Sequence, residues 1–296
     1  MRPIRLLAAC LIAALLAQPA GAGPLWRTAN PLMKQKPVEI AAQGVVLRLD
    51  PATQMVGEGE DAFEAGRIDA TVRFPGAPAF AVPADESRID AHGVWLGIGK
   101  LNRRDADPVV ILQGYSGGAH CCMTFQMAIR HAGQVKLVTL PMKDGEPDRR
   151  FPSDVDGDGT ADFLRADDSF LYAFSSYAGS WSVPQVWNLR DGEMVDVSRE
   201  ARFAGVYRAF AARTAKACRK GGNGACASHA AAMARLGKAA EGIAFAEAHA
   251  TQGDWYPADC MVETGADGEC PEGQERQFAN FGESLRWFLK QQGYLD

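Results

Sequence analysis

Short apolar runs, separated by turns that contain Gly, Pro or Asp, make up most of the chain between residues 45 and 140. Residues 123–130 alternate most clearly, with Met123, Phe125 and Met127 on one side, as expected for a strand whose successive side chains point to opposite faces. Four more runs have the length and composition of strands: 45–49, 68–74, 93–99 and 108–112. The pattern predicts a β-rich domain over residues 45–197, preceded by an extended N-terminal segment, residues 23–44.

Near Val197 the spacing of the apolar positions changes from that of strands to that of helices. Ser198 can cap a helix, and Phe203, Tyr207 and Phe210 follow it at helical spacing. Two further stripes contain Met233, Leu236 and Ile243, and Phe281, Leu285 and Phe288. Such stripes are typical of helices that face a core. Residues 198–296 are therefore predicted to form a small helical domain, and the fold class is α+β.

An internal repeat runs through the β-rich region. The segment GYSGGAHCC with the following FQMAIRHAGQVKLV is similar to SSYAGSWS with QVWNLRDGEMVDV, so that Tyr115 corresponds to Tyr177 and Gly133 to Gly192. Upstream, GKLNRRDADPVVI is similar to SDVDGDGTADFL. Each unit has an acidic loop, a strand, a turn of small residues and a hairpin. A period of about 60 residues is typical of stacked sheets or propeller-like blades.

The first 22 residues have the features of a signal peptide. Arg2 and Arg5 precede an apolar run from Leu6 to Ala17, and small residues at 20–22 form a cleavage site. The run is shorter than the roughly 20 residues that a membrane-spanning helix needs. No later stretch is long and apolar enough to cross a bilayer. The sequence predicts an exported protein with no transmembrane segment after signal removal, in a periplasmic or secreted location.

The chain has 31 basic and 36 acidic residues and a formal net charge of −5, with no basic run and no patch of interleaved basic and aromatic residues. Nucleic acid is therefore not expected as a partner, because its phosphates are bound by clustered Lys and Arg side chains. An unknown protein or a small-molecule ligand is expected instead.

Six cysteines follow the signal peptide, and an even number in an exported protein indicates disulfides. Sequence alone does not fix the pairing, although short Gly-containing loops favour Cys218–Cys226 and Cys260–Cys270. Cys121 and Cys122 are then left to pair with each other. Neighbouring Cα atoms lie about 3.8 Å apart, below the usual range for a disulfide, so this third pair is left open.

The segment SDVDGDGTADF, residues 153–163, carries the strongest chemical signal in the chain. Carboxylates occupy positions 1, 3, 5 and 9 of a tight loop, and a carbonyl oxygen is available at position 7: Asp154, Asp156, Asp158, Asp162 and Thr160. Ca²⁺ takes about six to eight oxygen ligands, and crowded carboxylates repel one another unless a cation lies between them. These five residues are predicted to form a calcium site, with calcium as the one cofactor. A helix–loop–helix site would need Glu at position 12, where Arg165 stands.

In its spacing, and in the apolar strand that follows, DVDGDGTADFL resembles the calcium loops of FG-GAP and VCBS-type repeats, which occur in integrin-like β-propellers. The resemblance covers this loop and, more weakly, the units on either side, residues 95–198. In the upstream copy, Lys100, Asn102 and Arg104 replace the first three Asp positions, so this copy is expected to have kept its turn and lost its ion. The family implies propeller-like or VCBS-like repeats in exported scaffold or binding modules, and it names no ligand.

The turn GYSGG matches G-x-S-x-G, the pattern around the nucleophile of serine hydrolases, with Ser116 in the nucleophile position. Such a site needs a strand before the serine and a helix after it, whereas residues 123–130 alternate like a strand. In the second repeat, Ala178 stands where Ser116 stands in the first, which favours an architectural turn.

The sequence thus favours an exported cell-envelope binding or scaffold protein with a structural calcium loop and no catalytic residue. Two alternatives stay open. One is a serine hydrolase that uses Ser116. The other is an inhibitor or partner of another envelope protein that acts through the helical domain.

Overall fold

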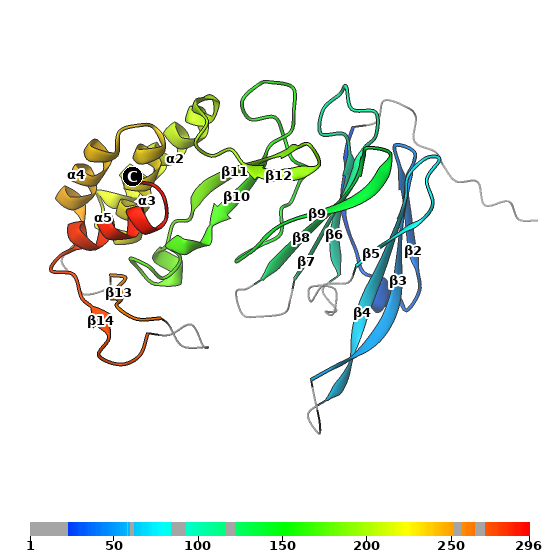
Figure 1. Ribbon diagram of the computed structural model, residues 1–296, viewed down its shortest axis with the longest axis horizontal. Helices are drawn as coiled ribbons and strands as arrows, with labels where there is room; N and C mark the ends of the chain where they lie inside the picture. Colours follow the sequence, from blue (N-terminus) through cyan, green and yellow to red (C-terminus); the bar gives the residue numbers. More distant parts are fainter. Residues whose placement is uncertain are drawn as a thin grey trace, which may run out of the picture.

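The computed structural model describes residues 23–57, 59, 62–83, 93–115, 122–251, 256–263 and 270–296. Sheets of four, five and three strands and a group of helices follow one another as layers along the long axis of the molecule (Figure 1). Among the described residues, no helix is long and apolar enough to span a membrane.

The outermost layer is the antiparallel four-stranded sheet, with the order β2-β3-β4-β5. Its strands are β2 (Val38–Ala42), β3 (Val45–Val56), β4 (Phe63–Arg73) and β5 (Phe80–Val82). The short helix α1 (Pro31–Lys34) lies against it, with Leu32 close to Gly66 of β4. Val45, Leu47 and Leu49 alternate inward along β3 and are fully buried, as a strand with one face on a core requires.

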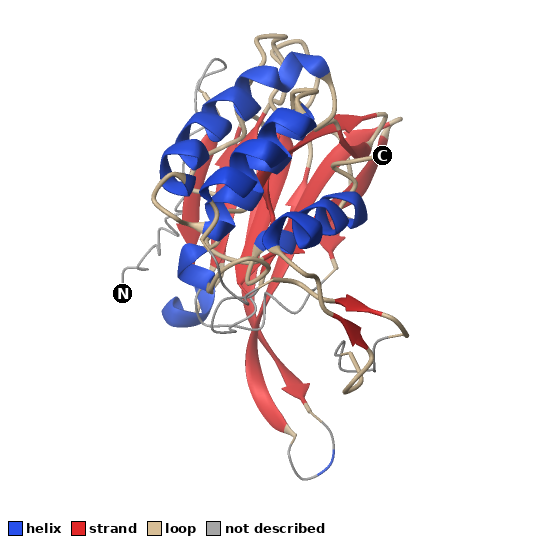
Figure 2. Ribbon diagram, turned by 90° about the vertical axis from the view of Figure 1, so that its left-hand side faces the viewer, coloured by secondary structure: helices blue, strands red, loops and turns tan. Residues whose placement is uncertain are grey.

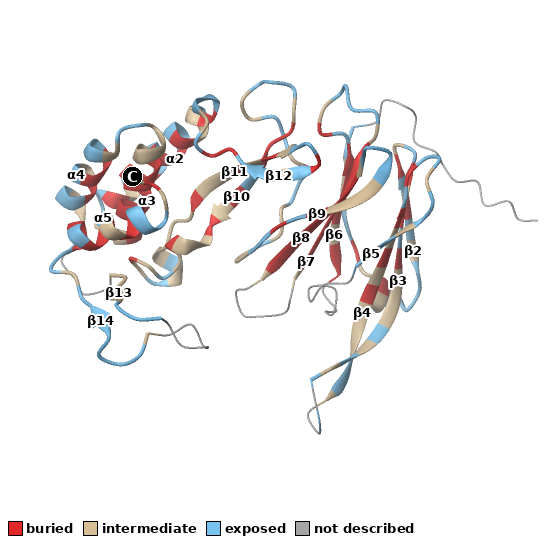
Figure 3. Ribbon diagram, in the orientation of Figure 1, coloured by how far each residue is buried: buried red, intermediate tan, exposed pale blue. Residues whose placement is uncertain are grey.

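The second layer is the five-stranded sheet, with the order β1-β6-β7-β8-β9. Its strands are β1 (Leu25–Ala29), β6 (Val94–Gly99), β7 (Val109–Tyr115), β8 (Met123–His131) and β9 (Gln134–Lys143). One face packs Leu96 and Val110 against the four-stranded sheet, and the other packs Ile111 and Phe125 toward Phe163 of the next layer. Burial on both faces explains why residues 109–112 are continuously apolar instead of alternating (Figure 3).

The third layer is a meander of three strands, β10 (Phe163–Asp167), β11 (Val183–Arg190) and β12 (Glu193–Asp196). Two 3₁₀ turns, η3 (Asp168–Phe170) and η4 (Tyr177–Gly179), lie between β10 and β11.

The two copies of the predicted repeat have the same strand order and lie against each other. The hairpin turns Ala132-Gly133 and Asp191-Gly192 both have positive φ at both residues, which suits the tight two-residue turns of hairpins. A Cβ on Gly192 would lie 2.9 Å from the His131 ring, so this close approach needs glycine. The two acidic loops also meet, because Asn102 and Thr160 form an isolated β-bridge.

The helical layer consists of the 3₁₀ turn η5 (Ala201–Phe203) and the helices α2 (Ala204–Cys218), α3 (Asn223–Arg235), α4 (Ala239–His249) and α5 (Phe281–Gln291). A small hairpin of β13 (Asp259–Cys260) and β14 (Glu275–Arg276) precedes α5. Figure 2 shows the helices covering the end of the stack of sheets. They share one core with the third sheet, in which Phe170 and Val186 pack with Tyr207 and Phe288.

The structure agrees with the predicted α+β fold, in which a β-rich N-terminal region precedes a helical C-terminal region. The sheets of the described residues are open layers, and none closes into a propeller. Two details differ from expectation. β1 and β2 pair into sheets within the segment 23–44 that was expected to be loosely extended. The shared core crosses the domain boundary expected at residue 198, because the third sheet needs the helices to cover its apolar face.

Candidate functional site

Residues 153–162 form a closed loop directly before β10. The Asp162 amide donates to the Ser153 carbonyl at 3.1 Å, and the Ala161 amide donates to the Leu101 carbonyl at 2.7 Å. Gly157 and Gly159 have φ values of +87° and +91°, which residues with a Cβ rarely adopt. The two glycines therefore allow the chain to reverse within the loop.

Backbone amides of the loop donate to its own carboxylates. Asp154 accepts the amides of Gly157 at 2.7 Å and Gly159 at 2.9 Å. The Oδ1 atom of Asp156 accepts the Asp158 amide at 3.0 Å, and the Oδ1 atom of Asp158 accepts the Thr160 amide at 2.7 Å. The hydrogen bond from Gly159 is the main reason that the pKa of Asp154 lies below its usual value. The charged form of Asp154 is thus favoured, while Asp156 and Asp158 each keep their Oδ2 atom for other contacts.

Three of the five predicted ligands converge. Asp154, Asp156 and Asp162 each offer one carboxylate oxygen, and these oxygens lie within 4.8 Å of one another. Asp162 is buried, and it accepts the Val155 amide at 2.8 Å and the Asn188 Nδ2 at 2.6 Å. Burial raises the pKa of Asp162 and outweighs the opposite effect of these hydrogen bonds. Hard oxygens at this separation fit the donor set that Ca²⁺ prefers.

A cation from the helical layer contacts two of the aspartates. Arg202, in η5, places Nη1 at 2.6 Å from the Oδ2 atoms of both Asp156 and Asp158. Its Nε donates to Glu200 at 2.8 Å, and its Nη2 donates to the Asn188 Oδ1. Asp158 therefore faces Arg202 in this arrangement. The guanidinium links the acidic loop to the start of the helical layer.

The last predicted ligand, Thr160, connects the two acidic loops. Its Oγ1 accepts a hydrogen bond from Asn102 Nδ2 at 3.0 Å, between positions that are 58 residues apart. Asn102 stands at the position that corresponds to Asp156 in the predicted repeat, and its side-chain amide contacts the acidic loop.

Ser116, the alternative catalytic residue, lies outside the described residues, as does Cys121. The strands on either side are described. β7 ends at Tyr115, β8 begins at Met123, and these two residues pair in antiparallel register. A nucleophile elbow is followed by a helix, whereas β8 is a strand.

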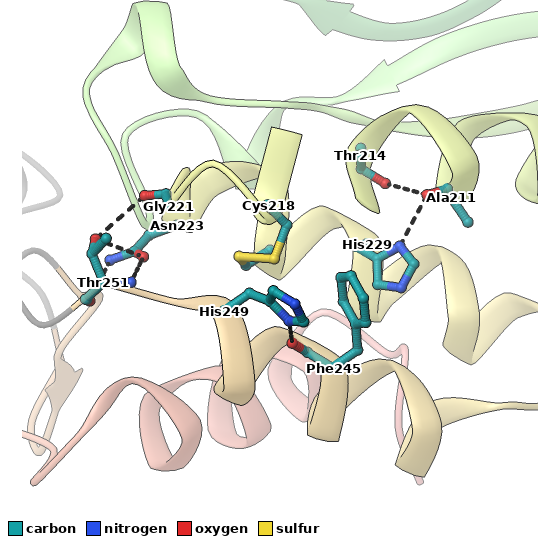
Figure 4. The surroundings of a disulfide bond; sticks show 10 residues. Ala211, Thr214, Cys218, Gly221, Asn223, His229, Phe245, His249 and Thr251 are labelled. Atoms are coloured by element: carbon teal, nitrogen blue, oxygen red, sulfur yellow. Dashed lines mark hydrogen bonds between the residues drawn. A yellow bond between two sulfur atoms is a disulfide. The ribbon is translucent and has the colours of Figure 1, made fainter. Parts of the chain in front are cut away.

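The structure pairs Cys218 with Cys226 and Cys260 with Cys270, the two pairings that loop spacing favoured. Cys122 is also disulfide-bonded. The Cys218–Cys226 bond joins the end of α2 to α3 (Figure 4). Disulfides indicate an oxidising compartment.

Two histidines pack on one phenylalanine in the same region (Figure 4). The ring centroid of Phe245 lies 4.3 Å from that of His249 and 4.6 Å from that of His229. The Nδ1 of His249 lies 2.9 Å from the Phe245 carbonyl, and the Nδ1 of His229 lies 3.0 Å from the Ala211 carbonyl. These contacts fix both rings between α2, α3 and α4.

Arg202 and Asn188 were not among the residues predicted from sequence. The sequence does point to Asn188, because it is a polar residue at an inward position of the strand sequence QVWNLR, and it is buried. A buried polar side chain needs a hydrogen-bond partner. Nothing in the sequence points to Arg202, since it contacts aspartates 44 and 46 residues away through the packing of two layers.

Comparison with known proteins finds a family model that matches the helical layer and relatives that match most of the chain. Residues 201–293 match the family model of the sll0997 C-terminal domain. A probable thylakoid lumen protein, sll0997, of Synechocystis is 28% identical over 248 residues, which cover 81% of this chain and 71% of that protein. The uncharacterized protein y4bJ of Sinorhizobium fredii is 28% identical over 240 residues; the match covers 78% of this chain and 36% of that protein.

Among solved structures, a Xanthomonas type IV secretion system related protein matches 58% of this chain and 99% of its own, with 12% identity and a TM-score of 0.15. That score is too low to support a conclusion about fold. The similarity to a lumen protein and the disulfides confirm the predicted periplasmic or secreted location: the protein is exported.

Proposed function

We propose that this exported protein is a binding or scaffold protein of the cell envelope whose acidic loop, residues 154–162, holds a structural calcium ion. The observation that carries the proposal is the convergence of carboxylate oxygens from Asp154, Asp156 and Asp162 within 4.8 Å of one another. Asp158 and the Thr160 carbonyl complete the proposed ligand set, as in the FG-GAP and VCBS-type loops that this segment resembles.

The position of the loop supports a structural role for the ion. The loop precedes β10, contacts the upstream loop through Thr160, and contacts the helical layer through Arg202. An ion that fixes the loop would stabilise its contact with the upstream loop and the start of β10. The surface that the rigid stack presents to a ligand or partner is then the functional part of the molecule.

The test is the melting temperature of residues 23–296 with added Ca²⁺ and with a chelator. A ligand that binds only the native state adds about 2.7 kcal/mol at 100 times its dissociation constant. For a chain of this size, that corresponds to a rise of roughly 5–10 °C. Asp154→Ala and Asp156→Ala are expected to abolish the rise, because each removes one of the converging oxygens.

Asp50→Ala is the matched control, since Asp50 is an aspartate on β3 that pairs with Arg48 in a different sheet. It is expected to keep the full calcium response. A wild-type protein that melts at the same temperature with calcium and with chelator would show that the loop is a turn without an ion. A full rise kept by all three variants would show that calcium binds elsewhere.

A further inference from the structure

The chain is acidic overall, yet one segment of the helical layer is strongly basic. Residues 199–240 contain nine lysines and arginines and one acidic residue, Glu200, in a chain whose formal net charge is −5. Glu200 is itself paired with Arg190 and Arg202. The basic residues are spread along this segment and form no continuous run, yet together they give it a net positive charge.

Four of these cations surround a groove of about 660 Å³ between α2 and α3. Its cationic lining residues, called the rim below, are Arg199, Arg208, Arg235 and Lys238. Its apolar lining residues, called the floor below, include Ala211, Ala212, Ala215, Met233 and Leu236. No Asp or Glu is among the described residues that line the groove. Such an arrangement favours an anionic group at the rim and an apolar body on the floor.

The rim cations have much of their hydrogen-bonding capacity unused. Arg208 is exposed and has no hydrogen bond or ion pair within the described part of the chain. Arg235 donates to the Gly293 carbonyl through Nη1, but its buried Nε has no partner there. Among the described residues, the Lys238 side chain pairs only with Glu241, at 3.3 Å on the surface. Surface pairs of this kind are weak because water screens the charges, so Lys238 is available to another anion.

A buried histidine adds a polar group to the floor. His229 lines the groove and is 7% exposed. Its Nδ1 lies 3.0 Å from the Ala211 carbonyl (Figure 4), which can only accept, so Nδ1 must donate. Burial lowers the pKa of His229 and favours the neutral ring, in which Nε2 is then an acceptor. Within the described residues this nitrogen has no hydrogen-bond partner, and the hydroxyl of a hydrogen phosphate or a carboxylic acid is a complementary donor.

We propose that the groove between α2 and α3 binds an anionic amphiphile, with a phosphate or carboxylate head group at the Arg208–Lys238 rim and a short alkyl chain on the alanine floor. A volume of 660 Å³ lies within the roughly 300–1,000 Å³ typical of small-molecule sites. The site is independent of the proposed calcium loop, since none of the five proposed calcium ligands lines the groove.

Isothermal titration calorimetry with dodecyl phosphate below its micelle concentration tests the proposal. The anionic probe is expected to bind at low ionic strength, where exposed charges are least screened. Dodecyltrimethylammonium and dodecyl maltoside have the same alkyl chain without the negative charge, and they are expected to bind at least about tenfold more weakly. Equal binding of all three probes would overturn the proposal, because the cationic rim would then make no contribution.

Paired charge reversals locate the site. The double variant Arg208→Glu/Lys238→Glu is expected to weaken binding of dodecyl phosphate by at least about tenfold. Lys216→Glu/Lys220→Glu changes the net charge equally, but at two exposed positions outside the groove lining, and it is expected to stay within about twofold of wild type. An equal loss of dodecyl phosphate binding in both double variants would mean that the probe is held by non-specific electrostatic attraction. That result would overturn the proposed site.

A floor variant tests the apolar half of the groove. Ala212 is exposed and lines the groove, so Ala212→Trp is expected to fill it without disturbing the core and to abolish binding, whereas Ala212→Ser is expected to retain it. Unchanged binding by the Trp variant would contradict the proposed floor. Sedimentation with phosphatidylglycerol vesicles then identifies the source of the head group. Sedimentation lost in the Arg208→Glu/Lys238→Glu variant indicates a membrane lipid, and binding of the free probe alone indicates a soluble amphiphile.

Discussion

At the scale of single residues, the C-terminal Tyr294 is held by a buried carboxylate of the third sheet. Its hydroxyl donates to Asp167 at 2.7 Å, and the two residues are 127 positions apart. Burial and the neighbouring Asp167 raise the pKa of Tyr294, which therefore stays protonated as the donor. The bond connects the end of the chain to the strand that follows the acidic loop.

Tyr294→Phe is expected to lower the free energy of unfolding by about 1.5–3 kcal/mol, because it leaves one oxygen of a buried carboxylate without its donor. Urea unfolding measures the change, which is expected as a lower midpoint with an unchanged slope. Tyr256→Phe is the control, since no hydrogen bond to the Tyr256 hydroxyl exists among the described residues. A loss below about 0.5 kcal/mol for Tyr294→Phe would mean that water replaces the hydroxyl.

The residues of the acidic loop were predictable because the loop is local. Asp154 accepts amides three and five residues ahead, and Gly157 and Gly159 stand where the turn needs positive φ. Arg202 and Tyr294 could not be predicted, because each acts across layers on a partner that no short-range pattern identifies.

At the scale of elements, the disulfide between α2 and α3 joins two helices that form the proposed anion groove. It closes a loop with a sequence separation of 8, and both cysteines are fully buried. In the chain-entropy model a loop of this size contributes about 2.5 kcal/mol.

Cys218→Ala/Cys226→Ala is therefore expected to lower the melting temperature by roughly 5–10 °C, measured by circular dichroism at 222 nm for the α-helical signal. Cys260→Ala/Cys270→Ala breaks a loop of similar length, with a separation of 10, but in the peripheral hairpin of β13 and β14. Its effect on this signal is expected to be smaller, because the cysteines lie outside the shared core. Equal effects would show that the hairpin unfolds together with the helices.

The elements were more predictable than their grouping. Residues 123–130 alternate, and the structure has β8 there; the first and third helical stripes agree with α2 and α5. The stripe from Met233 to Ile243 is divided between α3 and α4, which are separated at Leu236–Lys238. The grouping of β10–β12 with the helices was not apparent, because Phe170 and Val186 look equally suited to a core with either neighbour. Tertiary packing determines which layer these strands join, as it does for most amphipathic elements.

At the scale of the whole molecule, Arg202 lies where the stack of sheets meets the helical layer. Its Nη1 contacts the Oδ2 atoms of Asp156 and Asp158. The Oδ1 atoms of the same two residues accept hydrogen bonds from backbone amides. The Asp156 side chain is 2% exposed, so its charge needs a cation nearby. An ion that binds through the Asp156 Oδ2 must therefore compete with the guanidinium.

Arg202→Gln is expected to have two opposite effects. Without calcium, the free energy of unfolding falls by about 1–2 kcal/mol, because the aspartates lose their counter-charge and Arg202 is only partly buried. The apparent affinity for calcium rises by up to about tenfold, because the ion no longer has to displace the Arg202 guanidinium. Calorimetric titration with Ca²⁺ measures the affinity, and urea unfolding in the presence of a chelator measures the free energy of unfolding.

Arg190→Gln is the matched control, since Arg190 pairs with Glu200 and has no contact with the aspartates. The variant is expected to keep the calcium affinity of the wild type. Its free energy of unfolding is expected to change by about 0–1 kcal/mol, the usual contribution of a surface ion pair. Weaker calcium binding by Arg202→Gln would show that the arginine organises the loop instead of competing for it. Stronger binding would mean that calcium releases Arg202 from Asp156 and Asp158, so that the ion replaces a contact between the sheets and the helical layer with one inside the loop.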